Sequence, residues 1–150
     1  MATVCSLVGH IGENRQLYWT TGAANPCLSP FYPVFFPDTV TPAGYIEGSA
    51  NYNAGSFWWK SEKLHREALS RFTAFLDLIQ PQMKRYEEDM IAQLTEGQMP
   101  PSQETVDICF AEVNTMIEGW KEKLDRLPSN RISWFFRRYW RNYNEINGLS

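Results

Sequence analysis

Three cysteines and two histidines are the residues of this chain best suited to nucleophilic chemistry. A cysteine nucleophile needs a base within hydrogen-bond reach, and His10 is the histidine nearest to Cys5 in the sequence. Because five residues of extended strand would hold them about 16 Å apart, we expect Cys5 to pack as a small apolar side chain. Cys27 lies among prolines in a loop, where we expect that loop to pack around it or to hydrogen-bond with it.

The spacing of metal-binding residue types does not indicate a metal site. His65 has no second histidine or cysteine three or four residues away, so we expect a solvated histidine beside Glu62 and Arg66. The acidic run 87–89 lacks the spacing of a calcium-binding loop and predicts an exposed helical face. We therefore assign no catalytic, cofactor-binding or metal-binding residue, expect no cofactor, and leave the substrate-binding residues unknown.

Arginines alternate with aromatic residues in segment 131–143. These residue types bind single-stranded nucleic acid, and a basic amphipathic helix can also contact a membrane. A formal net charge of -3 and a broad apolar face at helical spacing instead favour a packing helix, in which Arg141 pairs with Glu145. We expect neither nucleic acid nor a membrane as a partner.

Composition predicts a soluble globular protein. The chain has 150 residues, of which 43% are hydrophobic and 21% charged, as in one ordinary domain. No apolar run approaches the roughly 20 residues of a membrane span, and the start of the chain lacks the features of a signal peptide. Three widely spaced cysteines favour neither a disulfide framework nor a zinc site, so we expect a reducing, cytoplasmic location.

The elements that must position these residues change in kind near residue 56. Segments 3–8 and 16–21 are rich in β-forming residues and predict a hairpin, with two strands and no more. Segment 25–42, here called the strap, combines repeated prolines with aromatic rings. Proline removes amide donors, which excludes a central strand or a helix, so we expect an extended strap whose rings need a covering surface that can lie outside this chain.

Apolar residues at three- and four-residue steps predict helices in the second half. We expect a helix over 60–79 that ends or kinks at Pro81, a second piece up to residue 94, a helix over 102–124 capped by Ser102, and a last helix capped by Ser129 or Asn130. Helices 60–79 and 102–124 should pack antiparallel. The predicted fold class is α+β in a single domain or domain fragment: short strands and the strap in 1–56, then a mainly helical part in 57–150.

Four short pieces carry a family resemblance: TVCSLV (3–8), LYWTTG (17–22), NPCLSPFYP (25–33) and FWWK (57–60) before a long helix. Their order and spacing resemble the C-terminal part of the dipeptidase and secernin family. The resemblance implies an N-terminal-nucleophile hydrolase of four-layer αββα fold, in which a processed N-terminal cysteine attacks an amide and its own α-amino group serves as base. It implies peptidase activity toward dipeptides for a complete protein.

The resemblance also implies that the catalytic cysteine lies upstream of the matched pieces. Cys5 aligns with an internal strand, and removal of Met1 would expose Ala2, which is no nucleophile. We therefore expect a C-terminal fragment or truncated homologue of a dipeptidase-like cysteine hydrolase, inactive alone. The alternative is a noncatalytic protein-interaction module, in which the prolines and rings of residues 26–42 dock on a partner. The expected partner is the remainder of the hydrolase or a second copy, and we expect a homo-oligomer.

Overall fold

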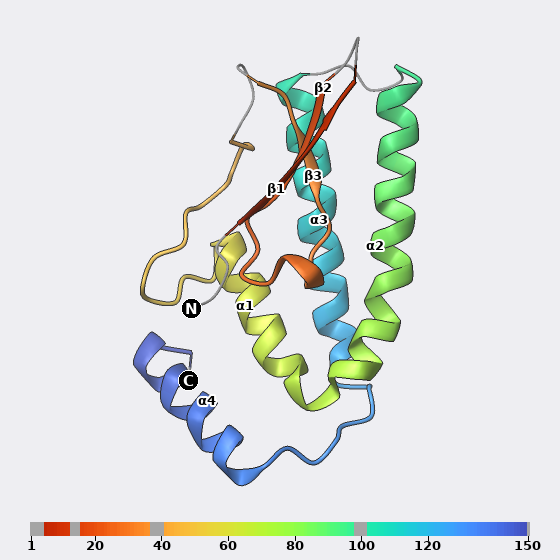
Figure 1. The fold of residues 1–150 in the computed structure, drawn as a ribbon. Coiled ribbons are helices and arrows are strands. Elements are labelled where there is room, and N and C mark those ends of the chain that lie inside the picture. Colours follow the sequence, from red (N-terminus) through yellow and green to blue (C-terminus); the bar gives the residue numbers. More distant parts are fainter. Residues whose placement is uncertain (1–4, 13–15, 37–40, 98–101, 150) are drawn as a thin grey trace.

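The computed structural model describes residues 5–12, 16–36, 41–97 and 102–149 and has the α+β architecture that the sequence predicts (Figure 1). A small sheet lies beside a layer of long helices, and a last helix lies beside the first. The elements in chain order are β1 (Ser6–Ile11), β2 (Gln16–Thr21), the 3-10 helix η1 (Pro26–Leu28), β3 (Tyr32–Val34), α1 (Phe57–Ala68), the 3-10 helix η2 (Leu69–Arg71), α2 (Phe72–Thr95), α3 (Gln103–Leu124) and α4 (Trp134–Asn147).

The sheet is antiparallel in the order β1-β2-β3. The prediction of only two strands is wrong, because the strap itself supplies β3. Pro33 is tolerated there since β3 is an edge strand of the described sheet, where it pairs with β2 only, with Pro33 opposite Trp19. The first strand begins at Ser6 and not at residue 3; residues 1–4 lie outside the described part of the chain.

This chain's own helices cover much of the strap, so the surface that its rings need does not have to lie outside this chain. Tyr32 and Val34 are almost fully buried, and the Tyr32 ring lies 5.4 Å from that of Phe110 on α3. Phe36 remains half exposed, and residues 37–40 lie outside the described residues. Leu28, Tyr32 and Val34 of the strap therefore belong to the core.

The break between the first helices falls at η2 and not at Pro81. Helix α2 continues through Pro81 from Phe72 to Thr95. Proline leaves the carbonyl of Asp77 without its helical donor, but both residues are exposed, so water can hydrate that carbonyl.

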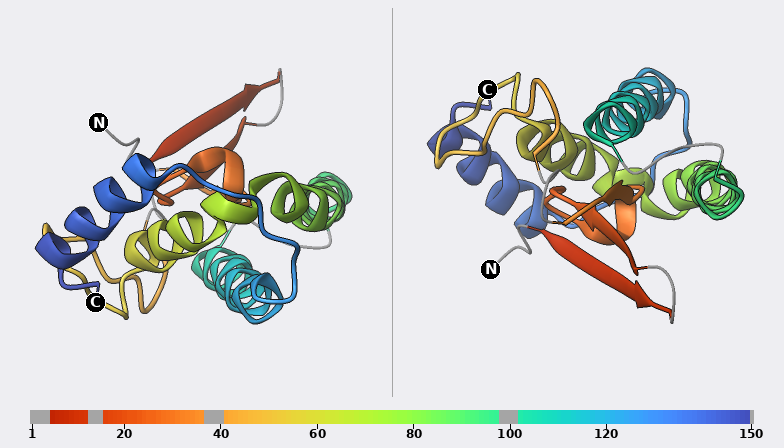
Figure 2. Two further views of the ribbon diagram at one scale, coloured as in Figure 1. Left: turned by 90° about the horizontal axis from the view of Figure 1, so that it is seen from below. Right: turned by 90° about the horizontal axis from the view of Figure 1, so that it is seen from above.

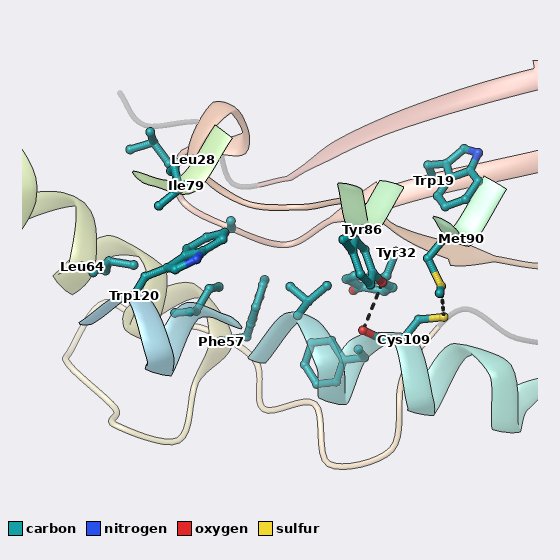
Figure 3. Packing of buried hydrophobic residues seen from close by; sticks show 14 of the residues in the cluster. Trp19, Leu28, Tyr32, Phe57, Leu64, Ile79, Tyr86, Met90, Cys109 and Trp120 are labelled. Atoms are coloured by element: carbon teal, nitrogen blue, oxygen red, sulfur yellow. Dashed lines mark hydrogen bonds between the residues drawn. The ribbon is translucent and has the colours of Figure 1, made fainter. Parts of the chain in front are cut away.

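Helix α2 packs antiparallel to α3 and supplies much of the core (Figures 1 and 3). The indole Nε1 of Trp120 donates to Gln82 Oε1 at 3.1 Å, and the hydroxyl of Tyr86 donates to the carbonyl of Cys109 at 3.3 Å. Helix α1 runs in the same direction as α3. The helix predicted over 60–79 was expected to pack antiparallel to 102–124. This is wrong for residues 60–68, which belong to α1, and holds for residues 72–79, which belong to α2.

The predicted cap of α3 is confirmed, since the amide of Thr105 donates to Ser102 Oγ at 3.2 Å. The predicted cap of the last helix is wrong, because Ser133 and neither Ser129 nor Asn130 caps α4. None of the residues of α4 is buried, so most of the expected packing face is exposed. The expected ion pair of Arg141 with Glu145 does not form.

Candidate functional site

A buried carboxylate lies at the centre of a polar cluster where α1 meets α4. Glu62 is only 4% exposed. Its Oε1 accepts from Arg66 Nε at 2.7 Å, one helical turn later, and its Oε2 accepts from Asn25 Nδ2 at 3.3 Å. The expectation that this face of the helix is solvated is therefore wrong.

The charge of Glu62 is stabilised by its neighbours. Burial alone raises the pKa of Glu62 and is the largest single effect, but His65 and Arg66 together outweigh it and hold that pKa below its usual value. His65 is not a solvated residue either: its side chain is 18% exposed, and its Nδ1 lies 3.6 Å from Glu62 Oε2. The cluster is thus an ion pair with a histidine beside it.

Arg66 connects α1 to α4. Its side chain is only 8% exposed, and its guanidinium carbon lies 5.6 Å from the Trp59 ring and 5.1 Å from the Trp140 ring. One terminal nitrogen donates to Asn144 Oδ1 at 2.9 Å. Two rings and two hydrogen bonds therefore fix the position of this guanidinium.

A hollow of about 470 Å³ opens beside Arg66, between α1 and α4. We call it the α1–α4 pocket. Its charged lining consists of three arginines and one glutamate, and its apolar lining includes the rings of Phe136 and Trp140. The charged residues are Arg66, Arg137, Arg141 and Glu145. The pocket therefore joins positive charge with an apolar wall.

The structure places Cys5 and His10 on opposite faces of the sheet. Cys5 is exposed just before β1, which corrects the prediction of a packed cysteine. It lines a hollow of about 300 Å³ together with Tyr32 and Tyr45. His10 lines a groove of about 370 Å³ on the other face, together with Trp19. No cysteine–histidine pair forms from these two residues.

The other two cysteines differ in environment. Cys27 is exposed, so the expected packing around it is not observed. Cys109 is buried, with its Sγ 3.5 Å from Met90 Sδ, and burial is the main cause that raises the pKa of its thiol to about 11. A thiol with that pKa is almost fully protonated at neutral pH and is a poor nucleophile.

The acidic run on α2 is only partly the exposed face that the sequence predicts. Glu88 and Asp89 are exposed, whereas Glu87 is half-buried and accepts from the amide of Phe31 at 3.4 Å. Burial raises the pKa of Glu87 by more than the hydrogen bond from Phe31 lowers it, so this pKa lies above its usual value. Within the described ranges, no group of three or more metal-ligating side chains could hold an ion. Among the helices that are described, none is long and apolar enough to cross a membrane.

Sequence reasoning missed the polar cluster because its partners come from distant segments. Asn25 and Asn144 lie 37 and 78 residues from the side chains that they contact. The local signal was the i, i+4 spacing of Glu62 and Arg66 next to Trp59, which is also typical of an exposed helix. Comparison of the chain with protein-family models, with curated proteins and with solved structures gave no match.

Proposed function

We propose that this chain is the C-terminal part of a dipeptidase-like cysteine hydrolase, in which it extends a larger sheet and supplies no nucleophile. The observation that carries the proposal is the open edge of β1. Among the described strands, it pairs with β2 alone, and it lies on the outside of the molecule, away from the helices (Figure 2). Leu7 and Val8, which face opposite sides of the sheet, are each about half exposed, and Ile11 is 74% exposed.

The β1 edge lacks the features that block strand pairing. Its sequence, SLVGHI, contains no lysine, glutamate or proline, the residues that commonly protect an edge strand. Beside it lies the apolar groove that Val8 shares with Trp19 and Ile91. A strand that pairs with β1 would form hydrogen bonds with the free backbone groups of β1. The side chains of the added strand, or of the segment that follows it, would cover the groove.

The nucleophile belongs to another part of the proposed hydrolase. Cys5 is exposed, and His10 lies on the opposite face of the sheet. A cysteine without a base nearby attacks amides poorly. Dipeptide hydrolysis is therefore proposed for the complete protein and not for these residues alone.

A panel of dipeptides incubated with the purified chain tests the absence of a nucleophile. We expect no turnover by the wild type, by Cys5→Ala or by the matched control Cys27→Ala, which removes the other exposed cysteine. Turnover that only Cys5→Ala abolishes would overturn the proposal and assign the nucleophile to Cys5.

The coding DNA upstream tests the proposed remainder. We expect an in-frame sequence that encodes an N-terminal cysteine and further strands, and we expect that its co-production with this chain restores dipeptide hydrolysis. Leu7→Pro in β1 should then abolish assembly, because the register leaves the Leu7 amide on the open edge and proline removes that donor. A reading frame without such a segment would favour the alternative.

The alternative is a noncatalytic interaction module, and the exposed rings of α4 favour it. Trp134 and Phe135 are 68% and 74% exposed, which is unusual for large apolar side chains. The strap is a poor docking element because Tyr32 and Val34 are buried in the chain's own core. An interaction module should therefore bind through α4.

A further inference from the structure

We propose that the α1–α4 pocket binds a small organic carboxylate whose body is compact, flat and apolar. The proposal is independent of the hydrolase proposal, because the pocket lies between α1 and α4 and shares no lining residue with the β1 edge. Its volume of about 470 Å³ lies within the range of pockets that bind small molecules.

The charge around the pocket favours a monoanion. Three arginines and one glutamate line it, and Glu62 lies directly behind Arg66. Counting both glutamates against the three arginines leaves one positive charge, which one carboxylate neutralises. A dianion such as a phosphate monoester would leave an excess negative charge in the same place.

Two of the arginines are free to bind this carboxylate. Arg137 and Arg141 lie one turn apart on α4, so both reach the same side of the helix. Neither forms an ion pair with a described carboxylate; Arg137 donates only to the carbonyl of Ile132, at 3.2 Å. Guanidinium groups bind carboxylates through paired hydrogen bonds.

Arg66 has a different part in the site. Its Nε and one terminal nitrogen already donate to Glu62 and Asn144. Since its side chain is 92% buried between two indole rings, it contributes a fixed positive charge at the base of the pocket. Its position does not depend on the ligand.

The rest of the lining is suited to a flat apolar body. Phe136 and Trp140 have ring centroids 6.1 Å apart, and both line the pocket together with Leu69, Ile132 and Leu149. The indole Nε1 of Trp140 is buried without an acceptor among the described residues.

Benzoate is the probe for this site, and benzamide is its neutral control of the same shape. Calorimetric titration of the full chain at low salt should show one saturable benzoate site with a dissociation constant of about 1 mM or lower. Benzamide should bind at least roughly tenfold more weakly, since it lacks the charge. Phenyl phosphate at neutral pH should also bind more weakly than benzoate. Benzoate should change the tryptophan fluorescence, because Trp140 lines the pocket.

Substitutions on α4 test the arginines. Arg141→Gln and Arg137→Gln should each weaken benzoate binding roughly tenfold. Arg138→Gln is the matched control, because Arg138 lies on the same helix but stacks on Trp134 and does not line the pocket. It should leave the affinity unchanged. Because all three side chains are exposed, the thermal unfolding midpoint of each variant should be close to that of the wild type, which shows that the variant is folded.

Four results would overturn the proposal. Benzamide that binds as tightly as benzoate would show an apolar pocket without anion selectivity, and tighter binding of phenyl phosphate would show that the ligand class is wrong. An equal loss in Arg138→Gln would show a general effect of surface charge. Absence of saturation up to about 20 mM benzoate would show that the pocket binds no such ligand.

Discussion

Replacement of the buried carboxylate of Glu62 by an amide is the sharpest test of the polar cluster. Glu62→Gln keeps the shape of the side chain but leaves Arg66 as a buried cation, 92% shielded from water, without its counter-ion. Removal of one partner of a buried ion pair costs about 3–5 kcal/mol. Arg66 would keep its bond to Asn144 and its two indole contacts, so we expect the lower end, about 3 kcal/mol.

Urea unfolding at pH 7, followed by circular dichroism, measures this cost. The control is Glu67→Gln on the same helix, where an exposed glutamate lies 4.0 Å from Lys63; its loss should change the free energy of unfolding by less than about 0.5 kcal/mol. Arg66→Met added to Glu62→Gln removes the unpaired cation, so the double variant should be no less stable than Glu62→Gln. A cost below about 1 kcal/mol for Glu62→Gln would show that water reaches the pair and would refute the reasoning.

The cost should also depend on pH, with a sign that follows from the depressed pKa of Glu62. The ionised form contributes stability that is present above the unfolded pKa of about 4.3 and is lost as the pH falls through the lower folded pKa. The difference between wild type and Glu62→Gln should therefore be present at pH 7 and shrink below about pH 4. A difference that grows on acidification would contradict the assignment.

Three further expectations concern other parts of the fold. Trp120→Ala should cost about 3–5 kcal/mol in urea unfolding, because Trp120 is 1% exposed; a change within about 0.5 kcal/mol would show that the seam between α2 and α3 is exposed. Glu87→Gln should increase stability at pH 7, because burial raises the pKa of Glu87, and this gain should disappear at acid pH; a gain that persists at acid pH would contradict that cause. The isolated chain should self-associate through β1 in sedimentation at micromolar concentration, Val8→Lys should prevent it, and Ile146→Lys on α4 should not; a clean 17.4 kDa monomer after a tenfold rise in concentration would refute pairing.

Local patterns predicted the elements whose formation depends on local sequence. The apolar face of α3 follows from the spacing of its apolar residues. Its cap follows from Ser102, whose side chain lies within one turn of the amide that it binds. The role of each proline depended on tertiary position instead. Pro33 fits a strand because β3 is an edge, and Pro81 fits inside a helix because the carbonyl that it leaves unpaired is exposed. Neither fact is visible in the sequence.

The polar cluster could not be predicted because burial decides its character. Glu62, His65 and Arg66 have the spacing of an ordinary solvated helix face. They become a buried ion pair because Asn25 and Asn144 arrive from segments far away in the chain. Tertiary position also decides which side of α4 packs against the rest of the chain. The spacing of its apolar residues predicts a helix, but the side that contacts α1 depends on where α1 lies.

The distribution of the core explains how β1 can remain an open edge in a folded chain. None of the residues of β1 belongs to the buried core, which comes from β2, β3, the strap and the helices. The free energy of folding therefore depends little on what covers β1. Pairing with β2 nevertheless holds β1 extended in a fixed register, from Ser6 opposite Thr21 to Ile11 opposite Gln16. A partner strand would meet an edge that is already ordered, so its binding need not pay the entropy of ordering β1.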